Sequence, residues 1–273
     1  MQADQGFVTD QLTMNYSEGP ASGPPLLLHG LSGDRRAWDV FFPSLQPEWH
    51  LYALDLRGHG ESGRVAGRYL LNDYVSDLAA VLSALPEPVV LVGHSLGALG
   101  ASASWPECVR GLVMFDPPMF NWKLSGEFSP AGRDWFQWVY DTVTQSGSPQ
   151  EIGARCRIMM AGAPESAILA KTEELSHLDP GTVAVVLRDG LFDGFDLEVI
   201  LRKVRCPTLL MHGEWSSGGA VRDEDVQLAE ANIPHLKVIG MPGAGHLFPW
   251  EQQETVLQHL NEFLGALPPA LRA

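Results

Sequence analysis

Ser95 lies at the centre of the segment Gly93-His94-Ser95-Leu96-Gly97, which matches the pattern G-x-S-x-G. An apolar run at 88–92 precedes this segment, and a small-residue run at 98–104, typical of a helix, follows it. A tight turn from strand to helix forces its serine into a strained backbone conformation that only small neighbours permit. We therefore expect Ser95 to be a nucleophile, with the N–H of Leu96 at the helix start placed to stabilise an oxyanion.

His246 is the histidine best placed to activate this serine. A serine hydroxyl is a weak nucleophile near neutral pH and needs a base within hydrogen-bond reach. Of the nine histidines, His246 ends the glycine-rich segment 242–246, after the last predicted strand and before the final helix. His29 and His59 lie in Gly-flanked turns, where structural or pocket-lining roles compete. His94 is expected to point the opposite way from the nucleophile.

Short apolar runs bounded by Gly, Pro or charged residues predict the strands that position these side chains. Continuous runs, rather than alternating ones, are typical of a parallel sheet covered on both faces. Helical patterns lie between the runs, such as the apolar stripe within 75–82 and the segment 251–263. This alternation predicts a doubly wound, mostly parallel α/β sheet, with residues 7–16 as an antiparallel edge. The predicted strands are 25–29, 49–55, 89–93, 109–115, 208–212 and 236–239.

The alternation stops between Phe115 and Cys206, where the sequence predicts several helices, among them 134–144, 151–160 and 183–191. A helical insertion after the carboxyl end of a strand lies over the edge where α/β sheets bind ligands, so we interpret it as a lid. A second packing layer without a gating role is the alternative. Trp135 and Trp138 share one helical face and either line a pocket or bury the lid against the core. The predicted core is therefore 1–116 with 204–273, and the predicted cap is 117–203.

With these motifs in place, the chain resembles the α/β-hydrolase family over nearly its whole length. His29 and Gly30 match the loop after the third strand of that family, which is its oxyanion loop. The segment 55–62, Asp-Leu-Arg-Gly-His-Gly-Glu-Ser, looks like its D-x-R-G-x-G-x-S turn, which is structural. The resemblance implies an α/β-hydrolase fold with a helical lid after the sixth strand. It also implies that the N–H of Leu31, or of Gly30, is the second oxyanion donor.

The acid that should orient His246 departs from the family pattern. In the family it commonly follows the seventh strand as G-x-x-D, but Gly213-Glu214-Trp215-Ser216 has serine at that position. Asp116 follows the sixth strand, an alternative position for the acid in this fold, and is our first choice. Glu214 is the alternative acid, followed by Asp223 or Asp225, whose acidic run most simply begins a helix.

Composition excludes several other classes of function. The formal net charge of −15 disfavours nucleic acid and anionic membrane surfaces as partners. The three cysteines, at 108, 156 and 206, are too scattered for a disulfide framework or a zinc site. No apolar run approaches the roughly 18 residues that span a bilayer. We expect a cytoplasmic protein, as a monomer or a homodimer.

No cofactor or metal is predicted. The sequence has neither a phosphate-binding G-x-x-x-x-G-K-[ST] loop nor a convincing dinucleotide fingerprint. Asp189, Asp193 and Asp196 lack the spacing of a metal loop, so a solvated turn is the better interpretation.

The function expected from these observations is a serine hydrolase that cleaves a carboxylic ester or lactone of an apolar small molecule. Ser95 attacks, His246 transfers the proton, and an acyl-enzyme is then hydrolysed. Thioesters, amides, carbon–carbon bonds beside ketones and perhydrolysis stay open, because the same residues support them. A ligand receptor with little turnover is the alternative from another class, favoured by the absence of the usual acid.

Overall fold

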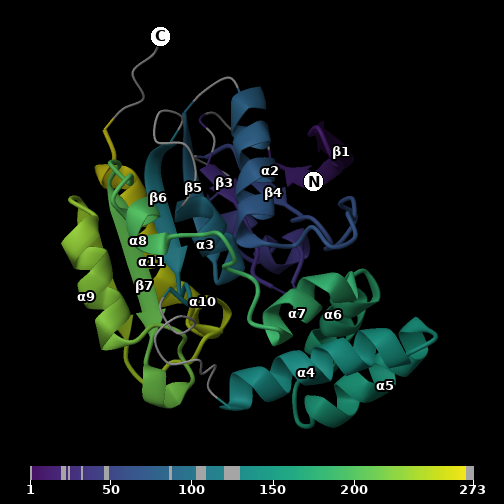
Figure 1. Cartoon of the computed structure of the whole chain (residues 1–273). Helices are drawn as coiled ribbons and strands as arrows, with labels where there is room; N and C mark the ends of the chain where they lie inside the picture. The colour runs from purple at the N-terminus through teal and green to yellow at the C-terminus, as the bar shows by residue number, and fades with distance from the viewer. Residues whose placement is uncertain are drawn as a thin grey trace.

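The computed structural model describes residues 2–19, 23, 25–31, 33–45, 49–85, 88–102, 109–119 and 130–268. Among these residues, eight strands form one sheet in the order β1-β2-β4-β3-β5-β6-β7-β8 (Figure 1). The strands are β1 Gln2–Val8, β2 Thr13–Glu18, β3 Pro25–Leu27, β4 Tyr52–Leu54, β5 Val89–His94, β6 Val109–Phe115, β7 Thr208–Gly213 and β8 Leu236–Met241.

The sheet is parallel from β4 to β8 and antiparallel at the β1–β2 edge. This arrangement confirms the predicted doubly wound α/β fold with an antiparallel edge. The two strands predicted at 25–29 and 49–55 are shorter in the structure, where only Pro25–Leu27 and Tyr52–Leu54 pair.

Both faces of the sheet are buried, which explains the continuous apolar runs. Along β5, Val89 and Leu91 face one core cluster, whereas Val90 and Val92 face the other. The first face packs mainly against α2, α3 and α9, and the second against η1, α1, α10 and α11. These elements are η1 Arg35–Trp38, α1 Phe42–Leu45, α2 Leu71–Ala84, α3 Leu96–Ser102, α9 Asp223–Asn232, α10 Phe248–Glu251 and α11 Gln253–Ala266.

The chain between β6 and β7 contributes a separate group of helices at one end of the sheet (Figure 1). They are α4 Pro130–Gln145, α5 Pro149–Met159, α6 Glu165–Ser176 and α7 Pro180–Leu187. This group has its own apolar cluster, which includes Val139, Ile152, Leu175 and Val183. A further helix, α8 Leu197–Leu201, packs into the main core cluster, as do Val185 and Val186 of α7.

The helix predicted at 183–191 is wrong in its second half. Helix α7 ends at Leu187, and Asp189 has a left-handed backbone with φ 58°. The Asp189-Gly190 pair is a turn signal in the sequence that marks this end. Cys156 and Cys206 are free thiols, and Cys108 lies outside the described residues. No helix in the described part of the chain is long and apolar enough to cross a membrane.

Candidate active site

Ser95 occupies a strained turn between β5 and α3. Its φ of 51° is left-handed, and its N–H donates to the carbonyl of Phe115 on the neighbouring strand at 2.9 Å. The two motif glycines are required by close packing. A Cβ at Gly93 would lie 2.5 Å from the backbone nitrogen of Ala98, and one at Gly97 would lie 2.2 Å from the carbonyl oxygen of His29. The pattern G-x-S-x-G is therefore part of a tight strand–turn–helix, as its spacing predicts.

Asp116 leaves the next strand in the same way. It follows β6 with a φ of 47°, and its N–H donates to the carbonyl of Met211 at 2.8 Å. Its carboxylate is fully buried and accepts hydrogen bonds from two backbone N–H groups. Oδ1 accepts from Gly213 at 3.0 Å, and Oδ2 accepts from Ala220 at 2.7 Å. These donors offset the cost of burying the side chain.

His246 contacts this carboxylate directly. Its Nδ1 lies 2.6 Å from Oδ2 of Asp116. Since a carboxylate oxygen accepts, the Nδ1–H of a neutral imidazole donates, and Nε2 is left with the lone pair that can accept a proton. The side chain of His246 is 32% exposed, so the imidazole lies between the buried carboxylate of Asp116 and solvent.

The loop after β7 supplies a hydrogen-bond donor to Asp116 and no carboxylate to His246. Glu214 does not take the position of an orienting carboxylate: its Oε1 accepts from the Ser216 hydroxyl at 2.6 Å, and its Oε2 accepts from the N–H of Gly243 at 2.7 Å. These hydrogen bonds hold the pKa of the Glu214 carboxyl below its usual range. Glu214 also donates its own N–H to the carbonyl of Ala244 at 2.8 Å. It therefore links this loop to the segment that carries His246.

The other two candidates for the orienting acid, Asp223 and Asp225, lie in the first turn of α9. Oδ2 of Asp225 accepts from the N–H of Arg222 at 2.7 Å, which closes the first turn, and Asp223 is exposed. Burial raises the pKa of Asp225 to about 6. Oδ1 of Asp225 has no hydrogen-bond partner among the described residues.

His94 contacts His246. Its ring is buried and lies 4.4 Å from that of His246, and its Nε2–H donates to the carbonyl of His246 at 2.9 Å. Burial, reinforced by the neighbouring imidazole, holds the pKa of His94 well below the ordinary histidine value. No sequence signal indicated this contact, because the two residues are far apart in the chain.

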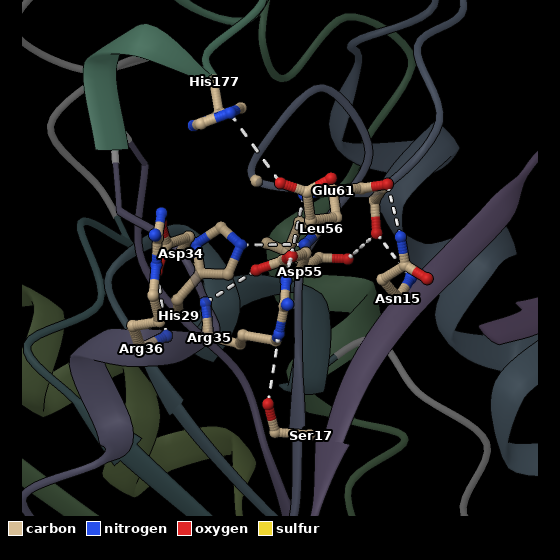
Figure 2. Close-up of polar contacts among 12 residues, drawn as sticks. Asn15, Ser17, His29, Asp34, Arg35, Arg36, Asp55, Leu56, Glu61 and His177 are labelled. Atoms are coloured by element: carbon tan, nitrogen blue, oxygen red, sulfur yellow. Dashed lines mark hydrogen bonds and ion pairs between the residues drawn. The ribbon is translucent and has the colours of Figure 1, made fainter. Parts of the chain in front are cut away.

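The loop after β3 passes beside the tight turn that carries Ser95. A Cβ at Gly30 would lie 3.2 Å from Cβ of Ser95, so this backbone passes directly beside the serine. His29 fixes the loop. Its Nε2 accepts from the N–H of Leu56 at 2.8 Å (Figure 2). Its Nδ1–H donates to the carbonyl of Gly30 at 2.5 Å. That carbonyl belongs to the same peptide group as the N–H of Leu31. The orientation of the predicted oxyanion donor is therefore set by His29.

A buried polar network supports this loop. Asp55 forms an ion pair with Arg35, accepts from the N–H of Arg35 at 2.7 Å and accepts from the N–H of Glu61 at 3.0 Å (Figure 2). Arg35 also reaches the hydroxyl of Ser17 at 3.1 Å. The turn 55–62 therefore braces the start of η1, in agreement with a structural role for this motif. In the described part of the chain, no group of three or more His, Cys, Asp or Glu side chains could hold a metal ion.

The fold and this arrangement define a hydrolase. The chain belongs to the alpha/beta hydrolase family, whose model matches residues 26–259. The resemblance inferred from the motifs is thereby confirmed.

Two curated relatives and one solved structure match nearly the whole chain. The 2-(acetamidomethylene)succinate hydrolase of Mesorhizobium japonicum is 28% identical over 94% of this chain and 93% of its own length. The N-formylmaleamate deformylase of Pseudomonas putida is 25% identical, over 88% of this chain and 87% of that one. The structure of a thermophilic esterase from Thermogutta terrifontis, determined with malate bound, is 26% identical with a TM-score of 0.73, covering 97% of this chain and 98% of that one.

Proposed function

We propose that this hydrolase cleaves a carboxylic ester or lactone of a small molecule through an acyl-enzyme on Ser95. The observation that carries the proposal is the 2.6 Å contact between His246 Nδ1 and Asp116 Oδ2, beside the strained turn that presents Ser95. A serine, a histidine and a buried carboxylate arranged in this order are the parts that nucleophilic acyl transfer requires.

In the proposed reaction, Oγ of Ser95 attacks the substrate carbonyl carbon while Nε2 of His246 takes its proton. Asp116 holds the imidazole in the correct tautomer and stabilises its positive charge. The N–H groups of Leu31 and Leu96, with Gly30 as the alternative donor, bind the oxyanion. The protonated His246 then gives its proton to the leaving alcohol, and water, activated by the same imidazole, releases the acid from the serine. Helices α4 to α7 are proposed to act as the lid over this site.

Amide hydrolysis is the second candidate. The two relatives described above are named for compounds that carry an acetamido and an N-formyl group. The same residues would cleave an acyl C–N bond if His246 protonated the leaving nitrogen. A panel of p-nitrophenyl esters, a γ-lactone and an N-formyl amide, compared at equal concentration, separates the two candidates by their kcat/KM values.

A fluorophosphonate probe separates an enzyme from a low-turnover receptor. An activated Ser95 should be labelled in the wild type and unlabelled in Ser95→Ala. Absence of labelling together with absence of turnover on every substrate of the panel would favour the receptor.

A further inference from the structure

Asp225 is a fully buried carboxylate that the proposed reaction does not use. It is the third residue of α9, and its Oδ2 accepts from the N–H of Arg222, which precedes the helix. Asp73 does the same in α2, where its Oδ2 accepts from the N–H of Leu70 at 3.0 Å, yet its side chain is 14% exposed. Capping a helix does not require burial, and burying a carboxylate costs free energy. The burial of Asp225 therefore points to a second role.

The N–H that Asp225 binds lies two residues along the chain from an N–H that binds Asp116. Ala220 donates to Oδ2 of Asp116 at 2.7 Å, and Arg222 donates to Oδ2 of Asp225 at 2.7 Å. Two residues of chain span at most about 7 Å, so the two carboxylate oxygens lie within about 12 Å of each other. Residues 220–222, the link before α9, are thus held at both ends by buried carboxylates.

The oxygen that this link supports is the one that contacts the base. Oδ2 of Asp116 accepts from the N–H of Ala220 and also lies 2.6 Å from Nδ1 of His246. The only other hydrogen bond described for this carboxylate is that of Oδ1 with the N–H of Gly213. If the link moved away, the carboxylate could turn about that remaining contact, and the orientation of the imidazole would be lost.

The charged groups around Asp225 give it a titration of its own. Burial is the main cause that raises its pKa to about 6; the carboxylates of Glu224 and Asp116 raise it further, whereas Arg222 lowers it through its N–H and its charge. Oδ1 of Asp225 has no hydrogen-bond partner among the described residues, so this oxygen can take a proton while Oδ2 keeps the N–H of Arg222. Asparagine at 225 therefore imitates the protonated side chain, because it keeps an acceptor oxygen and removes the charge.

We propose that Asp225 is a positioning residue for the carboxylate of Asp116. Through Arg222 it anchors the link, which keeps the N–H of Ala220 on the oxygen that orients His246. Its negative charge also favours the protonated form of that imidazole, which is the form that arises when the serine gives up its proton. The inference rests on the proposed function for the role of His246 as the base.

An NMR titration of the His246 imidazole in the Ser95→Ala protein tests the charge without requiring turnover. Adding Asp225→Asn should lower the pH at which His246 is half-protonated by about 0.3 pH units or more, because a nearby negative charge is lost. The His246→Gln protein identifies the signals of this ring. Asp223→Asn is the matched control, because Asp223 lies in the same turn of α9 but is exposed, and it should leave the titration unchanged.

Steady-state kinetics with a p-nitrophenyl ester tests the anchor in the otherwise wild-type protein. Asp225→Ala has no acceptor for Arg222 and should lower kcat by about tenfold or more, with a smaller effect on KM, because the loss falls on the charged transition state. Asp225→Asn should retain at least about a third of kcat near pH 8, since it keeps the acceptor. Asp73→Ala removes the corresponding cap of α2 and should keep kcat within about twofold of the wild type.

Three results would overturn the inference. The first is a His246 titration that Asp225→Asn leaves unchanged, and the second is an equal shift in Asp223→Asn. The third is a loss of kcat in Asp225→Ala no larger than in Asp73→Ala, which would reduce Asp225 to a helix cap. If Asp225→Ala does not fold, the titration of Asp225→Asn decides alone. Fluorophosphonate labelling of Ser95 in the otherwise wild-type protein reports the proposed function separately, so its failure is distinguishable from a failure of this inference.

Discussion

The Nε2–H of His94 donates to the main-chain carbonyl of His246 at 2.9 Å, and the two rings lie 4.4 Å apart. The residue before Ser95 therefore forms a hydrogen bond with the backbone of the proposed base. His94 also meets Trp250 edge-on, with 4.8 Å between ring centres. Because Asp116 holds the imidazole of His246 from its other end, the orientation of the base is fixed at both its backbone and its ring.

His94→Ala should lower kcat by about tenfold or more, with a smaller effect on KM. The substitution leaves the carbonyl of His246 without its buried donor, a loss of roughly 1–3 kcal/mol, and opens space beside the catalytic ring. Steady-state kinetics with a p-nitrophenyl ester measures the effect. His235→Ala is the control, because that side chain is exposed and should not affect turnover. Equal kcat values for both variants would show that His94 does not position the base.

Ser95→Ala should lower kcat by at least about a thousandfold without a change in fold. Alanine keeps the Cβ of serine and so adds no strain at a φ of 51°. Circular dichroism and a melting curve check the fold, and the fluorophosphonate probe checks the nucleophile. Ser83→Ala, on the exposed face of α2, provides a serine substitution outside the site. Near-normal turnover by Ser95→Ala would remove the proposed mechanism.

The parts of the site that depend on local sequence were predictable. The tight turn at Ser95 needs small residues at positions 93 and 97, which form a recognisable sequence pattern. The sheet needs apolar residues on both faces, which appear in the sequence as continuous apolar runs. His246 was identifiable from chain order and from the glycines before it.

The parts that depend on contacts between distant segments were not predictable. Chain order left four carboxylates as candidates for the acid, and only the structure shows which of them contacts His246. The same holds for Glu214, whose contact with Gly243 joins two loops. The contact between Arg36 and Glu173 likewise depends on how α6 packs.

Stability should fall as the pH falls from about 6.5 toward 4. Burial lowers the pKa of His29 to about 4 and that of His59 to about 3, whereas an unfolded histidine has an ordinary value of 6.5. In this range the unfolded chain binds protons that the folded chain excludes, so acid favours unfolding. Each histidine should contribute a loss on the order of 2 kcal/mol between pH 7.5 and pH 5.

Urea unfolding of the wild type and of His29→Gln at both pH values measures this effect. Asp225, with its pKa raised to about 6, opposes the trend because it gains a proton more readily when folded. The comparison between the two proteins cancels that contribution. The loss of stability on acidification should be about 2 kcal/mol smaller in His29→Gln, and equal losses would contradict the assignment of His29 as a buried neutral imidazole.

Asp116→Asn should lower kcat by about 10⁴, whereas Glu214→Gln should lower it far less. The carboxamide at 116 retains only one acceptor oxygen, although the native carboxylate accepts from Gly213, Ala220 and His246. Its NH₂ group therefore opposes either a backbone N–H or the imidazole, and the charge that stabilises the protonated His246 is lost. Glutamine at 214 keeps an oxygen for Gly243 or Ser216 and leaves Asp116 in place. Parallel kcat measurements with melting curves decide between them, and a larger loss in Glu214→Gln than in Asp116→Asn would reverse the two roles.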